Sequence, residues 1–198
     1  PPNPSSNPSS NQPACAQPPM IPPSASSAYF TAFRFPPNTE IYSALKETSS
    51  ILVDRSSLPP LSSTFITTAV GSVHTVTLRL ANATSQNRNC VRTFDPDERF
   101  EVLSLVGTLC EDGQHLHVSL GDKDGKVWGG HLISATTFTT LEVVLGAFPS
   151  SGILFKRPFD EETGFGELKV QDVREEKKVD LRGLFVAGIV FGVGMLWR

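Results

Sequence analysis

Cysteine is scarce in this chain, and its three cysteines are far apart. Cys15, Cys90 and Cys110 form no C-x-x-C pair, and their odd number leaves one without a partner. This spacing argues against a disulfide-rich scaffold and against a thiolate zinc site. We therefore interpret the cysteines as free thiols and expect an intracellular protein, cytoplasmic or nuclear.

Excess basic charge is also missing. The 198 residues include 17 Lys and Arg against 20 Asp and Glu, which gives a net charge of −3. The longest basic run is Lys177-Lys178. A chain of this charge has no general attraction to nucleic acid, so we expect no direct nucleic-acid binding.

Three sequence motifs of common enzyme classes are absent as well. The chain has no G-x-S-x-G nucleophile elbow, no Walker A loop and no G-x-G-x-x-G after a predicted strand. Gly164-Phe165-Gly166 is typical of a turn and not of a phosphate-binding loop. Any catalytic site must therefore come from another arrangement of residues.

The composition divides the chain into three regions. Residues 1–26 are almost entirely Pro, Ser, Asn and Gln, so we predict a disordered tail. Residues 27–170 are predicted to form one domain, and residues 171–198 combine a charged linker with an apolar end. With 39% hydrophobic residues, the chain as a whole has the composition of a globular protein.

Hydrophobic periodicity in the central region predicts mainly β-structure. Tyr29, Thr31, Phe33 and Phe35 alternate with other residues in a first strand. A short helix is predicted over about residues 39–52, with Asn38 as its N-cap. Further strands are predicted over 64–70, which Gly71 closes, and over 74–82, 99–109, 115–120, 126–132, 139–148 and 166–170. The pattern predicts an α+β fold, an antiparallel β-sheet with a few packed helices.

Three of the four histidines lie in one predicted β-hairpin, GQHLHVSLGDKDGKVWGGHL. Strand alternation places His115 and His117 on one face, opposite the apolar Leu116 and Val118. A three-residue turn at 123–125, with Gly125 in the left-handed conformation, places His131 opposite His117. A register shifted by one residue turns His131 away.

Two interpretations of these histidines remain open at this point. Glycines inside a strand often mark a close approach of another backbone or a ligand, and Gly129 and Gly130 precede His131. They favour a metal or ligand site formed by His115, His117 and His131. Alternatively, the three imidazoles are ordinary polar side chains on the solvated face of a sheet.

Five stretches along the chain resemble a known family, the plant and prokaryote conserved (PPC) domain. They are TAVGSVHTVTLRLAN, RFEVLSLVGTL, GQHLHVSLGDKDGKVWGGHL, TTLEVVLGAF and FDEETGFGELKV, in this order. The resemblance covers about residues 29–170. It implies an antiparallel sheet with packed helices, a homotrimer, and a divalent metal, zinc, held by His115, His117 and His131.

The same resemblance implies protein partners. In plant members the sheet contacts transcription factors, and the matching segment here is Arg99, Phe100, Glu101, Val102 and Leu103. Plant members also carry an R-G-R-P-type AT-hook for the DNA minor groove. This chain has none, and no basic residue precedes Arg34, so that DNA-binding mechanism does not transfer.

Two functions from different classes are consistent with these features. One is a non-catalytic oligomeric module that binds a metal or small ligand and mediates protein interaction. The other is a zinc-dependent hydrolase or lyase, because a three-histidine zinc with an open position can activate water. Glu142 is the candidate for a general base or for a residue that supports the ligands.

The apolar end of the chain has three interpretations. Residues 183–197 lie between two arginines and contain a Gly188-x-x-x-Gly192 spacing. A helix over these residues spans about 22 Å, which is shorter than the roughly 30 Å hydrocarbon core. The segment is a short membrane anchor, a buried or subunit-facing segment, or a non-native tail from alternative splicing or gene modelling.

Overall fold

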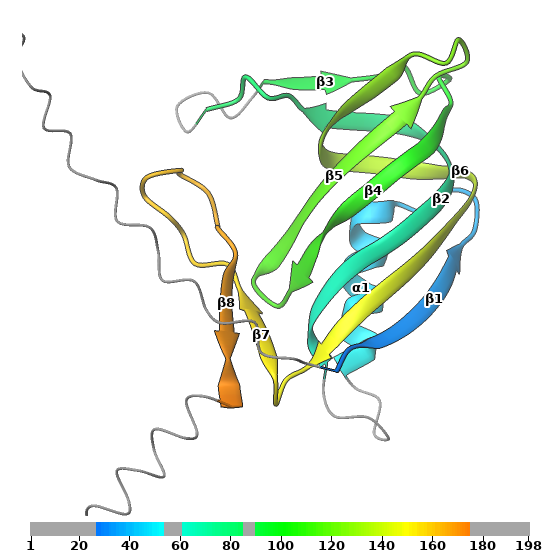
Figure 1. Cartoon of the computed structure of the whole chain (residues 1–198). Coiled ribbons are helices and arrows are strands. Elements are labelled where there is room, and N and C mark those ends of the chain that lie inside the picture. Colours follow the sequence, from blue (N-terminus) through cyan, green and yellow to red (C-terminus); the bar gives the residue numbers. More distant parts are fainter. Residues whose placement is uncertain (1–26, 54–60, 85–89, 175–198) are drawn as a thin grey trace, which may run out of the picture.

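The computed structural model describes residues 27–53, 61–84 and 90–174. This part of the chain contains eight strands and one helix (Figure 1). In chain order they are β1 (Tyr29–Phe35), α1 (Ile41–Val53), β2 (Leu61–Arg79), β3 (Val91–Thr93), β4 (Phe100–Cys110), β5 (Gly113–Gly121), β6 (Val127–Pro149), β7 (Ile153–Lys156) and β8 (Lys169–Asp172).

The main sheet is antiparallel and closes on itself. Its six strands follow the order β1-β6-β5-β4-β2-β3, and β6 also pairs with β2. The closed circuit therefore runs through β6, β5, β4 and β2 (Figure 1). Strand β6 makes this closure because it has 23 residues and curves: its beginning pairs with β5 and its later part with β1, while β2 follows most of its length.

Alternation along the strands fills the interior of this closed sheet. On β5, Leu116 and Leu120 are fully buried and Val118 is 6% exposed. From α1, which packs against β2 and β6, Ile41 and Leu45 are also buried. The apolar faces of the strands and the helix thus form one core, and the polar face of β5 with its histidines points outward.

The predicted antiparallel sheet is confirmed, but the chain is richer in β-structure than the α+β prediction implied. The described residues hold one helix where a few were expected. The two predicted strands before and after Gly71 are one strand, β2, and the strands of residues 126–132 and 139–148 are one strand, β6. Bulges in the β2–β6 pairing interrupt the alternation, which is why the sequence pattern divided each strand in two.

The start of the helix also differs from the prediction. Asn38 has a φ of 63° and its backbone N–H donates to Thr137. The cap is instead Glu40, whose carboxylate accepts from the backbone N–H groups of Tyr42 and Ser43 at 3.1 and 2.7 Å. A carboxylate here satisfies two N–H groups of the first turn and interacts favourably with the helix dipole.

The predicted tail of residues 1–26 and the apolar segment of residues 183–197 lie outside the described residues. Among the residues that are described, no helix is long and apolar enough to cross a membrane. Strand β8 ends at Asp172, and the backbone N–H of Val173 donates to Gly152.

Candidate metal centre

The turn between β5 and β6 has the predicted geometry. The backbone N–H of Asp122 donates to Lys126 at 3.0 Å, and the N–H of Gly125 donates to Asp122 at 2.9 Å. Gly125 has a φ of 76°, in the left-handed region that favours glycine. The Asp122 carboxylate accepts from the Trp128 indole N–H and from two backbone N–H groups of the turn, and the indole bond is the main cause of its lowered pKa.

This turn fixes the register that brings the histidines together. His117 pairs directly with His131 across β5 and β6, and His115 precedes His117 by two residues on the same face. The ring centroid of His115 lies 5.0 Å from the ring centroid of His117 and 5.0 Å from that of His131. The ring centroids of His117 and His131 are 5.6 Å apart. Residues that strand parity and turn chemistry singled out thus form one cluster.

The two glycines before His131 allow other backbones to approach. A Cβ atom on Gly130 would lie 2.7 Å from the carbonyl oxygen of Arg79 on β2. A Cβ atom on Gly129 would lie 3.1 Å from the carbonyl oxygen of Val118 on β5. The close approach on the Gly130 side places Arg79 opposite His131, so that β2 contributes a cation beside the cluster.

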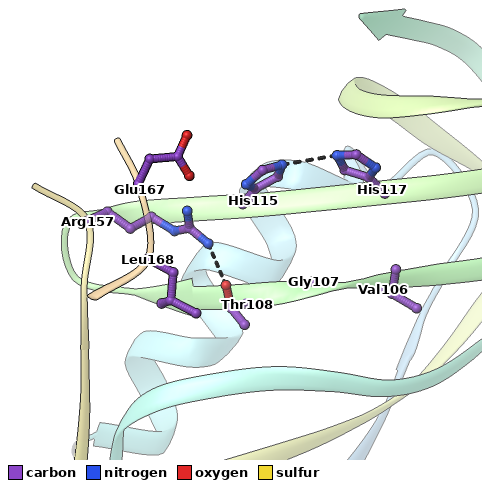
Figure 2. Close-up of a pocket in the computed structure, with 8 residues that line it drawn as sticks. All are labelled: Val106, Gly107, Thr108, His115, His117, Arg157, Glu167 and Leu168. Atoms are coloured by element: carbon purple, nitrogen blue, oxygen red, sulfur yellow. Dashed lines mark hydrogen bonds between the residues drawn. The ribbon is translucent and has the colours of Figure 1, made fainter. Parts of the chain in front are cut away.

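The donor set of the cluster fits a transition metal. The Nε2 atoms of His115 and His117 are 3.0 Å apart (Figure 2). Two nitrogens bound to one tetrahedral zinc are separated by about 3.3 Å, from bond lengths of about 2.05 Å. One nitrogen from each of the three histidines lies within 4.8 Å of the others. In addition, Nδ1 of His131 is buried without a hydrogen-bond partner, which is the kind of atom that a bound cation satisfies.

Burial and nearby cations lower the pKa of two of these imidazoles. Burial, followed by the charge of Arg79, lowers the pKa of His131 to about 4. Burial, followed by the charge of Arg157, also lowers the pKa of His115. A neutral imidazole has a free lone pair for a metal, so the same environment that opposes protonation prepares these rings as ligands.

A segment between β7 and β8 adds groups that the sequence patterns did not reveal. The guanidinium of Arg157 donates to the hydroxyl of Thr108 and to the carbonyl of Gly166. Glu167 lies on the same side of β5, beside His115 (Figure 2). Its charge raises the pKa of His115 and so partly opposes the effects of burial and Arg157. The stretch FDEETGFGELKV was part of the family resemblance, but no local spacing connected it with the histidines.

The structure does not bring Glu142 to the cluster. This residue lies exposed on β6, eleven residues after His131, and pairs with Arg34 on β1 and Val70 on β2. It lines neither of the two pockets that border His115. The carboxylate whose charge acts on His115 is instead that of Glu167.

The predicted partner-binding segment begins just before β4 and has two faces. Phe100 and Val102 are 2% and 6% exposed and belong to the core. Glu101 and Leu103 point outward, and Leu103 is 56% exposed. The guanidinium of Arg99 lies over the ring of Phe138, with 4.1 Å between the carbon and the ring centroid. Arg99, Glu101 and Leu103 are therefore the exposed members of this segment.

Comparison with known proteins shows similarity on several levels. The bifunctional protein GlmU of Synechococcus sp. (strain JA-3-3Ab) is 41% identical over 117 residues, which is 59% of this chain but 17% of GlmU. The chain therefore spans about a sixth of the length of this curated relative.

Two solved structures have a similar fold. A hypothetical protein from Salmonella cholerae-suis is 31% identical, with a TM-score of 0.63, over 75% of this chain and 97% of its own. A metal-containing protein from Archaeoglobus fulgidus is 25% identical, with a TM-score of 0.56, over 73% of this chain and 95% of its own. The model of the Plants and Prokaryotes Conserved (PCC) domain family matches residues 27–149, which confirms the resemblance seen in the sequence, and the chain belongs to this family.

Proposed function

We propose that this domain is a non-catalytic, oligomeric metal-binding module in which His115, His117 and His131 hold one divalent cation. The observation that carries the proposal is the convergence of three imidazoles, two with lowered pKa, at one register position of the β5–β6 hairpin. The relative from Archaeoglobus fulgidus, which is described as metal-containing, supports it.

Zinc is the cation that we propose for this site. Three neutral nitrogen donors suit borderline metals such as zinc, copper or nickel and not the oxygen-seeking calcium or magnesium. Three protein ligands leave a fourth position of a zinc tetrahedron open, and His117 is exposed on that side of the sheet. An open position allows the metal to take a further ligand from solvent.

The proposed oligomer is a homotrimer, and the surface of a single chain supports the burial of its β4 face. Leu103 and Val106 lie on this strand with 56% and 50% of their surface exposed. Leu168 and Phe159, from the segment between β7 and β8, are 40% and 65% exposed. Val106 and Leu168 line the same pocket and so lie together, and contiguous exposed apolar groups are typical of a protein–protein interface. The same side carries Glu101, so it also serves the proposed contacts to other proteins.

The metal is tested with purified protein by elemental analysis and by zinc titration in a calorimeter. We expect one zinc per chain in the wild type and loss of at least 90% of bound zinc in His117→Ala. The matched control is His74→Ala, because His74 lies on β2 outside the cluster, against Phe138. Equal zinc content in His117→Ala and the wild type would contradict the proposal. Light scattering on a sizing column measures the trimer, which Leu103→Asp should disrupt.

One observation favours a second function, a zinc-dependent hydrolase or lyase. Glu167 lines a pocket together with His115, where a carboxylate can accept a proton from a metal-bound water. A screen of esters, phosphoesters and cyclic nucleotides with zinc-loaded protein tests this function. The hydrolase or lyase function is established over the non-catalytic module if the wild type turns over a substrate, Glu167→Gln abolishes this turnover, and the zinc content of the variant is unchanged.

A further inference from the structure

A pocket opens directly beside the histidine cluster. It has a volume of about 320 Å³, enough for a small molecule, and it lies between the β4–β5 turn, the end of β2 and the segment after β7. His115 and His131 form one wall. The other groups that matter for recognition are Arg79, Asp112, Gln114, Arg157 and Glu167.

Arg157, which lines the pocket, carries a buried donor without an acceptor. The terminal nitrogens of Arg157 are held by Thr108 and Gly166, which fixes the orientation of the guanidinium. Its Nε atom is buried and has no hydrogen-bond partner. A buried N–H group of a guanidinium without an acceptor costs free energy, and an oxyanion is the acceptor that matches it best.

Gln114, which also lines the pocket, carries a buried acceptor without a donor. Gln114 is 9% exposed, and its Nε2 donates to the backbone carbonyl of Tyr42 at 2.6 Å. A carbonyl only accepts, so this bond settles which end of the amide is nitrogen. The Oε1 atom of Gln114 is left buried without a partner. It requires a hydroxyl or another N–H or O–H group.

The balance of charge around the pocket favours an anion once a metal is bound. Arg79 and Arg157 offset the carboxylates of Asp112 and Glu167, which line the same pocket. A divalent cation held by three neutral histidines keeps its positive charge, because these ligands bring no negative charge. An anion that takes the open coordination position neutralises it. In the described part of the chain, neither arginine forms an ion pair with a carboxylate.

We propose that this pocket binds a small hydroxycarboxylate, and this inference rests on the proposed metal site. The carboxylate accepts from Arg157 Nε and lies near Arg79, while the hydroxyl donates to Gln114 Oε1. One ligand oxygen completes the coordination of the metal held by His115, His117 and His131. The ligand thereby satisfies a donor, an acceptor and a charge that the protein leaves unmatched.

The experiment measures the binding of L-malate to zinc-loaded protein by calorimetry, with succinate as the analogue that lacks the hydroxyl. We expect malate to bind about fivefold more tightly than succinate, because succinate leaves Gln114 Oε1 unpaired. Arg157→Lys keeps the charge but removes the Nε donor, and it should weaken malate binding at least tenfold. Arg34→Lys is the matched control, because Arg34 is an exposed residue of β1.

Two further arms make every outcome decisive. The same titration with sn-glycerol 3-phosphate distinguishes a carboxylate from a phosphate ligand, and tighter binding of the phosphate would overturn the assignment to a carboxylate. The malate titration is repeated on metal-free protein, so that a failure of the pocket can be distinguished from a failure of the metal site. Zinc binding without malate binding refutes the pocket alone. Equal affinity for malate and succinate, or equal effects of Arg157→Lys and Arg34→Lys, would also refute it. If the protein binds malate but no zinc, and Arg157→Lys weakens the malate binding, the anion pocket stands without the metal site. Binding of neither zinc nor malate refutes both the pocket and the metal site.

Discussion

Replacement of Gly130 by alanine tests the close approach of β2 to the histidine hairpin. The new Cβ atom would lie 2.7 Å from the Arg79 carbonyl oxygen and 3.5 Å from Leu78 Cβ, so the two strands must separate. Overpacking of this kind costs about 1–3 kcal/mol. The lower chain entropy of alanine in the unfolded state returns about 0.4–1 kcal/mol. The expected net loss is about 1–2 kcal/mol in the free energy of unfolding, or about 4–8 °C in Tm.

The assay is urea unfolding of metal-free protein, followed by zinc titration of the same variant. Because His131 directly follows Gly130, we expect zinc affinity to fall about tenfold as the ring moves away from its partners. Gly129→Ala is the control: its Cβ atom meets the Val118 carbonyl at 3.1 Å, a contact that a small shift relieves. A Gly130→Ala protein as stable as the wild type, or no more destabilised than Gly129→Ala, would refute the argument.

Four further predictions concern the histidines, the core and the helix cap. The pKa of His131 is lowered to about 4 and that of His115 is also lowered, so the rise in Tm that zinc causes should persist at pH 6 and vanish near pH 4. Metal-free protein should lose stability as the pH falls from about 6.5 to 4, because the histidines of the unfolded chain take up protons before those of the folded chain. A Tm that stays constant over this pH range would contradict the burial of His131. Leu45→Ala should cost about 2–5 kcal/mol in urea unfolding, because Leu45 is fully buried between α1 and the sheet. Glu40→Ala should cost about 1 kcal/mol through loss of the helix cap, and an unchanged urea midpoint would show that the cap contributes nothing.

The histidine hairpin was predictable because its determinants are local. Strand alternation decides the face of His115 and His117, and the backbone of Gly125 decides the turn. Once the turn is known, the pairing of His117 with His131 follows by counting along two strands. Each of these steps depends on residues within one short stretch of the chain.

The lengths of β2 and β6 were not predictable in the same way. Both strands contain bulges, and a bulge reverses the alternation that identifies a strand from its sequence. The pattern therefore divided each of them in two. The helix cap was predicted wrongly for a related reason. The backbone N–H of Asn38 donates to the carbonyl of Thr137 on β6, and only the folded chain brings this partner close.

The cations and the carboxylate around the cluster depend on contacts that are distant in the sequence. Arg79 reaches His131 because β2 pairs with β6. Arg157 reaches His115 because its backbone N–H donates to the Asp112 carboxylate, which holds the segment after β7 against the β4–β5 turn. Glu142 was the candidate for a general base, yet β6 carries it away from the site, and Glu167 lies beside His115 instead.

The sequence by itself determined the family, the turn at 123–125 and the shared face of His115 and His117, while the structure fixed the register that adds His131. These features follow from side-chain period and turn conformation, which are properties of a few neighbouring residues. Only the tertiary structure decided that the sheet closes on itself, that Arg79, Arg157 and Glu167 border the histidines, and that a donor and an acceptor remain unmatched beside them. Closure and burial depend on which distant strands pack together, and no local pattern specifies that choice.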